Sequence, residues 1–133
     1  MTALTSDAQR VEKEGRLQSM PMAVAKAFKG SILMKNPAGY VLPAASLASA
    51  VFAGVAYEQV DNSGGSAGDL SVRVETERAF NFAGAGFTQA DLLKEVYAAD
   101  DNTVQIAAGT NLVKVGKIIE VISATEVLVK LEV

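Results

Sequence analysis

The 133-residue chain contains no cysteine, no histidine and no tryptophan, and aromatic residues make up only 6% of it. Without cysteine it has no disulfides, thiolate metal ligands or cysteine nucleophile. Without histidine it lacks the commonest zinc ligand and the usual general base near neutral pH, which excludes Ser-His-Asp and Cys-His arrangements. Catalysis would have to depend on carboxylates, lysine, serine or tyrosine. We therefore expect no enzyme, no catalytic residue, no metal site and no bound cofactor.

Charge and hydropathy narrow the range of partners. The chain has 12 lysine and arginine residues against 15 acidic ones, a net charge of −3, and its basic residues are scattered. Without a basic stripe or aromatic stacking platforms, a nucleic-acid partner is not expected. No apolar run approaches the ~18 residues of a membrane helix, and the first residues lack the apolar region of a secretory signal. We expect no membrane partner and synthesis in the cytoplasm.

The C-terminal end has the strongest β pattern. Residues 113–122 form one long β run, residues 123–125 a polar turn, and residues 126–133 alternate between apolar and polar. In this last run one predicted face holds Val127, Val129, Leu131 and Val133. Two β runs joined by a short polar turn predict a hairpin with one buried face.

Short strands are predicted along the rest of the chain as well. They cover residues 16–20, 31–35, 40–43, 51–60, 70–75, 79–82, 94–98 and 103–106. A reverse turn at residues 36–39 and a glycine-rich loop at residues 61–68 separate some of them. A capping pattern predicts a short helix over residues 88–93. With half of the residues apolar, the pattern predicts a mainly β fold: a small barrel or sandwich with one or two short helices.

Two of these strands carry more detailed expectations. In residues 51–60, Gly54 predicts a bulge or a close backbone approach. In residues 70–75 the alternation is strict, so that Leu70, Val72 and Val74 share one face. Ser71, Arg73 and Glu75 are predicted on the opposite, solvated face.

The N-terminal residues lack the apolar pattern of the rest. We expect residues 1–19 to form an extended arm and residues 20–133 a single β-rich domain. Leu4, Val11, Leu17 and Met20 are spaced along this part of the chain. A segment that only meets solvent has little use for them, so they are the predicted partner contacts. A frayed terminus, or a short helix over residues 7–14, is the alternative.

Motifs with known chemistry fail on inspection. The loop at residues 61–69 lacks the Gly-Lys-Ser/Thr ending and the following helix of a phosphate-binding loop. The acidic residues Asp61, Asp69, Asp100 and Asp101 lack the spacing of a helix–loop–helix calcium site, and are better explained as solvated turn carboxylates. Residues 84–86 (GAG) begin like a dinucleotide fingerprint but do not continue as one.

Several longer segments match a pattern seen elsewhere. They are residues 1–7 (MTALTSD), residues 54–63 (GVAYEQVDNS) with the following small-residue loop and alternating strand, residues 97–104, and the closing strand rich in valine and glutamate. Together they resemble a family of small proteins encoded beside the major capsid protein in tailed phages and prophages. The resemblance covers nearly the whole chain, and its motifs are turns and strands rather than catalytic residues. Residues 20–29 (MPMAVAKAFK) depart from it, being richer in alanine and more helix-like.

That family is thought to comprise head decoration, or cement, proteins. The resemblance implies a virion protein on the outside of the capsid that binds the major capsid protein and stabilises the head lattice. The lambda-type decoration protein, a β-rich homotrimer, plays a comparable role. Two alternatives stay open: a phage tail-associated or receptor-binding β-module and, more remotely, a carboxylate-based hydrolase.

The lack of histidine and cysteine generates a first test. A chelator such as EDTA should leave the thermal midpoint of unfolding unchanged, because a metal bound only by the native state would add to its stability. Differential scanning calorimetry with and without the chelator measures this. A decrease of more than about 3 °C on chelation would contradict the expectation.

Overall fold

The computed structural model describes residues 3, 5–7 and 15–133. In this part of the chain the elements are β1 (Leu17–Pro21), β2 (Lys26–Ala27), β3 (Ile32–Lys35), β4 (Val41–Pro43), β5 (Val51–Ala56), β6 (Val60–Asp61), β7 (Ser71–Glu75), β8 (Ala79–Ala83), the 3-10 turn η1 (Gln89–Asp91), β9 (Glu95–Ala98), β10 (Val104–Gln105), β11 (Lys114–Ser123) and β12 (Glu126–Leu131). The mainly β fold predicted from the sequence is confirmed.

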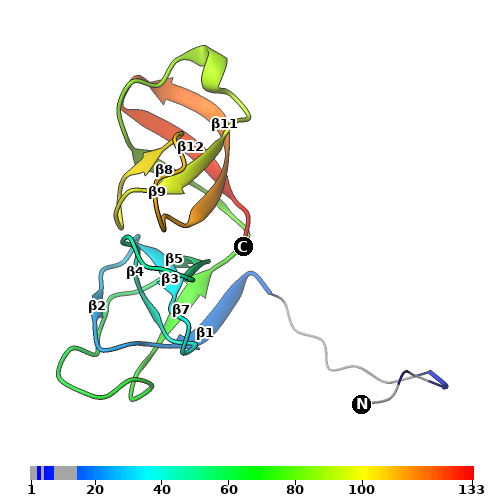
Figure 1. Ribbon diagram of the computed structural model, residues 1–133, viewed down its shortest axis with the longest axis vertical. Helices are drawn as coiled ribbons and strands as arrows, with labels where there is room; N and C mark the ends of the chain where they lie inside the picture. The colour runs from blue at the N-terminus through cyan, green and yellow to red at the C-terminus, as the bar shows by residue number, and fades with distance from the viewer. Residues whose placement is uncertain (1–2, 4, 8–14) are drawn as a thin grey trace.

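The strands form two five-stranded antiparallel sheets and one two-stranded sheet. The first sheet has the order β1-β7-β5-β3-β4, the second has the order β10-β9-β11-β12-β8, and β2 pairs with β6. The first sheet occupies the lower half of the molecule and the second the upper half (Figure 1). The chain passes from one half to the other after β7, so each half is built from a continuous stretch of sequence.

Both sheets curl until their outer strands approach each other. In the first half, an isolated bridge joins Met22, just after β1, to Val41 of β4. In the second half, a bridge joins Ala83 of β8 to Thr103, just before β10. Each sheet is therefore a partly closed barrel, in line with the small barrel or sandwich expected from the strand spacing.

The buried apolar residues form two clusters that share the strands of the first sheet. The first-sheet core comprises Met22, Ala27, Leu33, Val41, Ala53, Ala56, Val72 and Val74. The larger joint core comprises Ile32, Met34, Ala44, Phe52 and Val55 from the first half, and Phe82, Phe87, Val96, Ala98, Val104, Val113, Val115, Ile118, Val127, Val129 and Leu131 from the second. Strands β3 and β5 thus have one face in each core.

Gly54 allows β5 to serve both cores. Phe52 and Val55 point to the joint core, and because they are three residues apart, the strict two-residue period of a strand is broken between them. The ladder between β5 and β3 is irregular at this point. Gly54 has φ = +136°, and a Cβ atom there would lie 2.3 Å from the carbonyl oxygen of Glu75. The close backbone approach predicted at Gly54 is confirmed.

The alternation predicted for residues 70–75 is confirmed for Val72 and Val74 and wrong for Leu70 and Glu75. Val72 and Val74 are fully buried, as predicted. Glu75 was expected in solvent but is only 4% exposed. Glu75 lies between Leu17 of β1 and Val55 of β5, and its carboxylate is bound by the Arg16 side chain. Leu70, which precedes the strand, is 45% exposed.

The C-terminal hairpin is formed by β11 and β12, as predicted. Val127, Val129 and Leu131 are buried in the joint core. Val133, expected on the same face, is 62% exposed because β12 ends at Leu131. Its exposure corrects the sequence-based expectation.

The predicted helix at residues 88–93 is only the 3-10 turn η1. The backbone N–H of Thr88 donates to the Asp91 carboxylate at 2.9 Å, and Lys94 Nζ donates to the same side chain at 3.0 Å. These bonds, that from Thr88 most of all, hold the pKa of Asp91 below its ordinary value of 3.8. The backbone leaves the helical conformation at Leu92, where ψ is 133°, and Leu93 follows with φ = +68°, so the turn does not continue as a helix.

Strand β1 overlaps the end of the predicted N-terminal arm, which was expected to cover residues 1–19. This strand begins at Leu17 and pairs with β7 over its full length. Residues 17–19, assigned to the arm from the sequence, are therefore part of the first sheet.

Burial of the hairpin predicts the effect of a charge there. Val129→Asp should lower the free energy of unfolding by roughly 3–5 kcal/mol, because it places an unpaired carboxylate in the joint core. Val133→Asp is the matched control at an exposed position and should change it by no more than about 0.5 kcal/mol. Urea denaturation of the two variants measures both values. A Val129→Asp variant as stable as the control would contradict the assignment of the core.

Candidate functional site

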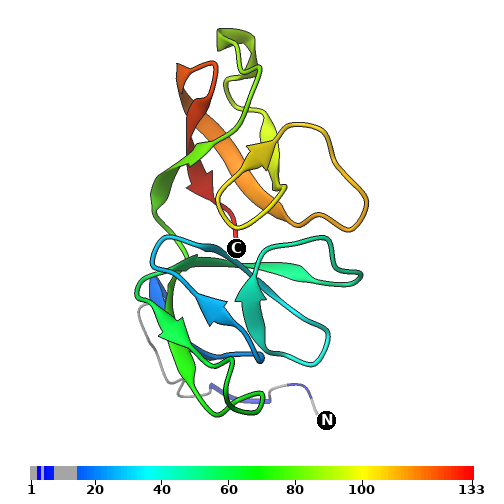
Figure 2. The same cartoon turned by 90° about the vertical axis from the view of Figure 1, so that its left-hand side faces the viewer.

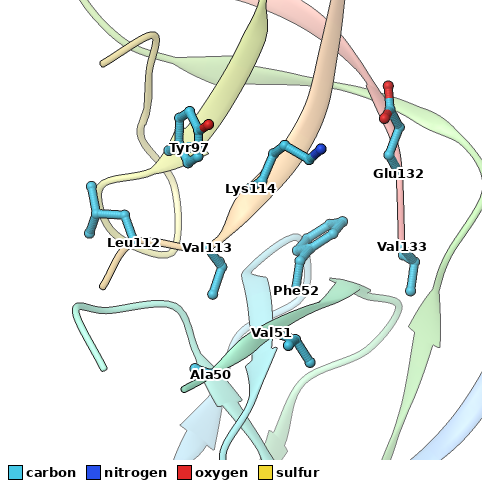
Figure 3. A pocket seen from close by; sticks show the side chains of 9 residues that line it. All are labelled: Ala50, Val51, Phe52, Tyr97, Leu112, Val113, Lys114, Glu132 and Val133. Carbon is cyan, nitrogen blue, oxygen red and sulfur yellow. The ribbon is translucent and has the colours of Figure 1, made fainter. Parts of the chain in front are cut away.

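Two neighbouring hollows lie where the two sheets meet. One, with a volume of about 340 Å³, is lined by Ala50, Val51, Phe52, Tyr97, Leu112, Val113, Lys114, Glu132 and Val133 (Figure 3). The other, of about 330 Å³, is lined by Met20, Pro21, Lys35, Gly39, Val41, Val51, Phe52, Ala53 and Val133. They share Val51, Phe52 and Val133. We call the two hollows together the seam depression.

The seam depression is mainly apolar and combines distant parts of the sequence. Val51 starts β5 in the first sheet, whereas Val133 follows β12 of the second sheet. The C-terminal end lies between the two halves in both views (Figures 1 and 2). Val51 is 51% exposed and Val133 62%, while Phe52, 8% exposed, fills the space beneath. Val51 and Val133 thus present apolar side chains to solvent beside the two hollows.

A few charged side chains surround these apolar residues. They are Lys35, Lys114 and Glu132. Lys114 is paired with Glu95 at 3.4 Å, and both side chains are more than 40% exposed, at 43% and 44%. Such an exposed ion pair contributes little to the stability of the fold, and its members can pair with charges of a binding partner instead. These charged residues therefore suit the choice of a partner better than the strength of its binding.

The structure places the predicted partner contacts in different positions. Met20 lines the seam depression and also packs against the first-sheet core. Leu17 is half-buried in β1 and lines neither hollow. Leu4 and Val11 lie outside the described residues. Of the two predicted contacts that the structure describes, Met20 lies in the depression and Leu17 does not.

No local sequence pattern predicts the exposure of Val51 and Val133. Val51 belongs to a predicted strand, and Val133 was placed on a buried face. Val51 is the first residue of β5 and pairs with Lys35 of β3 but not with β7, and Val133 follows the end of β12. An apolar residue at the end of a strand is only a weak sign of a binding surface. It becomes informative when the fold brings two such residues to the same hollow, as it does with Val51 and Val133.

Arg16, which directly precedes β1, is bound to the end of β7. Arg16 Nη1 donates to both carboxylate oxygens of Glu75, at 3.0 and 3.2 Å. The Glu75 side chain is 6% exposed and that of Arg16 32%. Thr76 donates its backbone N–H to the Arg16 carbonyl at 2.8 Å. These contacts fix the start of β1 against the end of β7.

The acidic residues considered for calcium are in separate turns. Asp100 accepts bonds from the backbone N–H groups of Asn102 and Thr103, at 2.8 and 2.7 Å. Asp69 accepts from the N–H of Ser66 at 2.8 Å. Asp61 accepts from Ser63, which lowers the pKa of its carboxyl from the ordinary value of 3.8. In residues 3, 5–7 and 15–133, no three acidic residues gather as metal ligands.

Comparison with models of protein families, with curated proteins and with solved structures gives no match. Within the described part of the chain, no helix has the length and hydropathy to cross a membrane.

The Arg16–Glu75 pair generates a stability prediction. Arg16→Ala should lower the free energy of unfolding by about 2 kcal/mol, because the Glu75 carboxylate is left buried without its cation. Arg73→Ala is the control: Arg73 pairs with Glu58 at 2.8 Å, but the two side chains are 53% and 34% exposed. Arg73→Ala should lower the free energy of unfolding by clearly less than Arg16→Ala does. Denaturant unfolding compares the two, and equal losses would contradict the role given to burial.

Proposed function

We propose that this chain is a structural virion protein that binds the outer surface of a tailed-phage capsid and stabilises the head lattice. The resemblance of its sequence to head decoration proteins supports this function. So does the position of Met20, which lies in the seam depression beside the exposed Val51 and Val133. Met20, one of the predicted partner contacts, and the exposed apolar surface therefore belong to one proposed contact region.

The energetics of this region suit assembly in many copies. Burial of apolar surface stabilises a contact by about 25 cal/mol per Å². The seam depression is small, so one such contact is weak in isolation. On a closed shell the contact is repeated many times, and neighbouring contacts reinforce one another through the shared lattice. A small apolar site is therefore sufficient for a protein that decorates a lattice.

The N-terminal residues extend the reach of this contact. An extended chain of ~15 residues spans up to roughly 50 Å, enough to reach a neighbouring subunit. In the proposed complex they lie on the major capsid protein. Any force on them is transmitted to β1, which pairs with β7 from Leu17 to Pro21. The ion pair between Arg16 and Glu75 holds the residue that directly precedes β1 against the end of β7.

The proposal includes partners and location. The chain binds the major capsid protein and further copies of itself, as a homotrimer. It takes its place on the capsid exterior after synthesis in the host cytoplasm. It has no catalytic role, no cofactor, no nucleic-acid partner and no membrane partner.

The decisive experiment measures retention on capsids. The full chain and a variant lacking residues 2–14 are each incubated with DNA-filled capsids assembled from the major capsid protein of a tailed phage. Sedimentation then separates bound from free protein. The deletion should leave the melting temperature of the free protein within about 2 °C of the original, because these residues precede β1, and should reduce retention at least tenfold.

Point variants separate the seam depression from the N-terminal residues. Val133→Asp should also weaken retention, because it places a charge in the apolar contact. Val24→Asp is the matched control, since Val24 is 55% exposed but does not line the depression. Retention of all variants at the level of the full chain would overturn the proposal. Binding to purified tails in place of capsids would favour the tail-associated alternative.

A further inference from the structure

A third hollow lies at the other end of β5, away from the seam depression. It has a volume of about 190 Å³ and is lined by Lys29, Gly30, Val55, Ala56, Tyr57, Glu75, Arg78 and Phe80. These residues come from the loop before β3, from β5 and β7, and from the chain that leads into β8. In Figure 1 this is the region where β7 rises from the lower half toward the upper half.

The lower surface of this hollow is apolar and rigid. Val55 and Ala56 are each only 2% exposed, since they belong to the two cores on either side of β5. Phe80 is half-buried. Tyr57, 43% exposed, carries the Arg73 guanidinium 4.9 Å from its ring centroid. A ligand in this hollow would therefore contact an apolar surface that does not need to be ordered first.

Two cations beside the hollow have no carboxylate partner among the described residues. They are Lys29 and Arg78, both exposed. The carboxylate of Glu75 is bound by Arg16 at 3.0 and 3.2 Å. Asp101 lines an adjacent hollow with Lys29 but forms no ion pair with it. The local charge available to a ligand is therefore positive.

The other charges nearby are already compensated. Arg73 donates to Glu58 at 2.8 Å, and this bond holds the pKa of the Glu58 carboxyl below its ordinary value of 4.5. Lys26 lies over the ring of Phe28, 4.8 Å from its centroid. Lys29 and Arg78 are thus the cations that remain for an incoming anion.

The size of the hollow decides between kinds of ligand. Sites for drug-sized molecules have volumes of roughly 300–1,000 Å³, whereas this hollow holds one side chain. We propose that it binds a segment of a partner protein in which a glutamate lies next to a large apolar residue. The apolar side chain packs on Val55 and Phe80. The carboxylate accepts charge-assisted hydrogen bonds from Lys29 and Arg78.

A peptide titration tests this site without capsids, so its outcome is independent of the proposed function. The ¹⁵N-labelled full chain is titrated with acetyl-Ala-Leu-Glu-Ala-amide while the amides of Gly30, Ala56 and Tyr57 are followed by NMR. These should shift in a saturable way, with a Kd on the order of 1 mM, as expected for a single side-chain contact. The corresponding glutamine peptide should bind roughly tenfold more weakly, because it cannot form the charge-assisted bonds.

Protein variants provide the matched comparison. Arg78→Gln and Lys29→Gln should each weaken binding of the glutamate peptide several-fold, whereas Lys130→Gln, at an exposed position on β12 of the other sheet, should leave it unchanged. The site is overturned if the glutamate peptide gives no saturable shift, if the glutamine peptide binds equally well, or if all three variants behave alike. It is also overturned if acetate alone shifts the same amides at the same concentration, because the apolar contact would then have no role.

Discussion

The fold depends on β3 and β5 being covered on both faces. In most small antiparallel sheets one face meets solvent, and a strict alternation of apolar and polar residues is sufficient. Here Leu33 lies in the first-sheet core while Ile32 and Met34 lie in the joint core, so successive residues of β3 are all buried. The second sheet therefore packs directly on the first. Without this shared layer, the two halves would be separate small barrels with little core of their own.

Gly54 is the backbone feature that makes the shared layer compatible with the strand pairing. The bulge in β5 changes which face of the strand each side chain occupies, so that Phe52 and Val55 both reach the joint core. It also brings the backbone of β5 against the carbonyl oxygen of Glu75, where any side chain would collide. The same contact region buries Glu75, which explains why this carboxylate needs Arg16. The conformation of Gly54 thus affects the joint core, the position of Glu75 at the end of β7 and, through Arg16, the start of β1.

The two proposed binding regions lie at opposite ends of β5. At its first residues, Val51 and Phe52, strand ends from both sheets leave apolar side chains exposed around the seam depression. At its last residues, Val55 and Ala56, the smaller hollow lies between Lys29 and Arg78. Because β5 is held by both cores, neither region has to become ordered when a partner binds. Contacts on a strand that is already ordered cost less conformational entropy when a partner binds.

The sequence by itself determined the elements whose signals are local. The C-terminal hairpin, the turn at residues 36–39, the glycine-rich loop and the apolar face of β7 all follow from periodicity and turn residues within a few positions. Met20, which stands out by its apolar character in a polar segment, lies in the seam depression. The tertiary structure decided the rest. Burial of Glu75, exposure of Val51 and Val133, and the meeting of these valines with Met20 depend on which strands become neighbours. Strand pairing joins residues far apart in the chain, such as Leu17 and Glu75, and no local pattern specifies it.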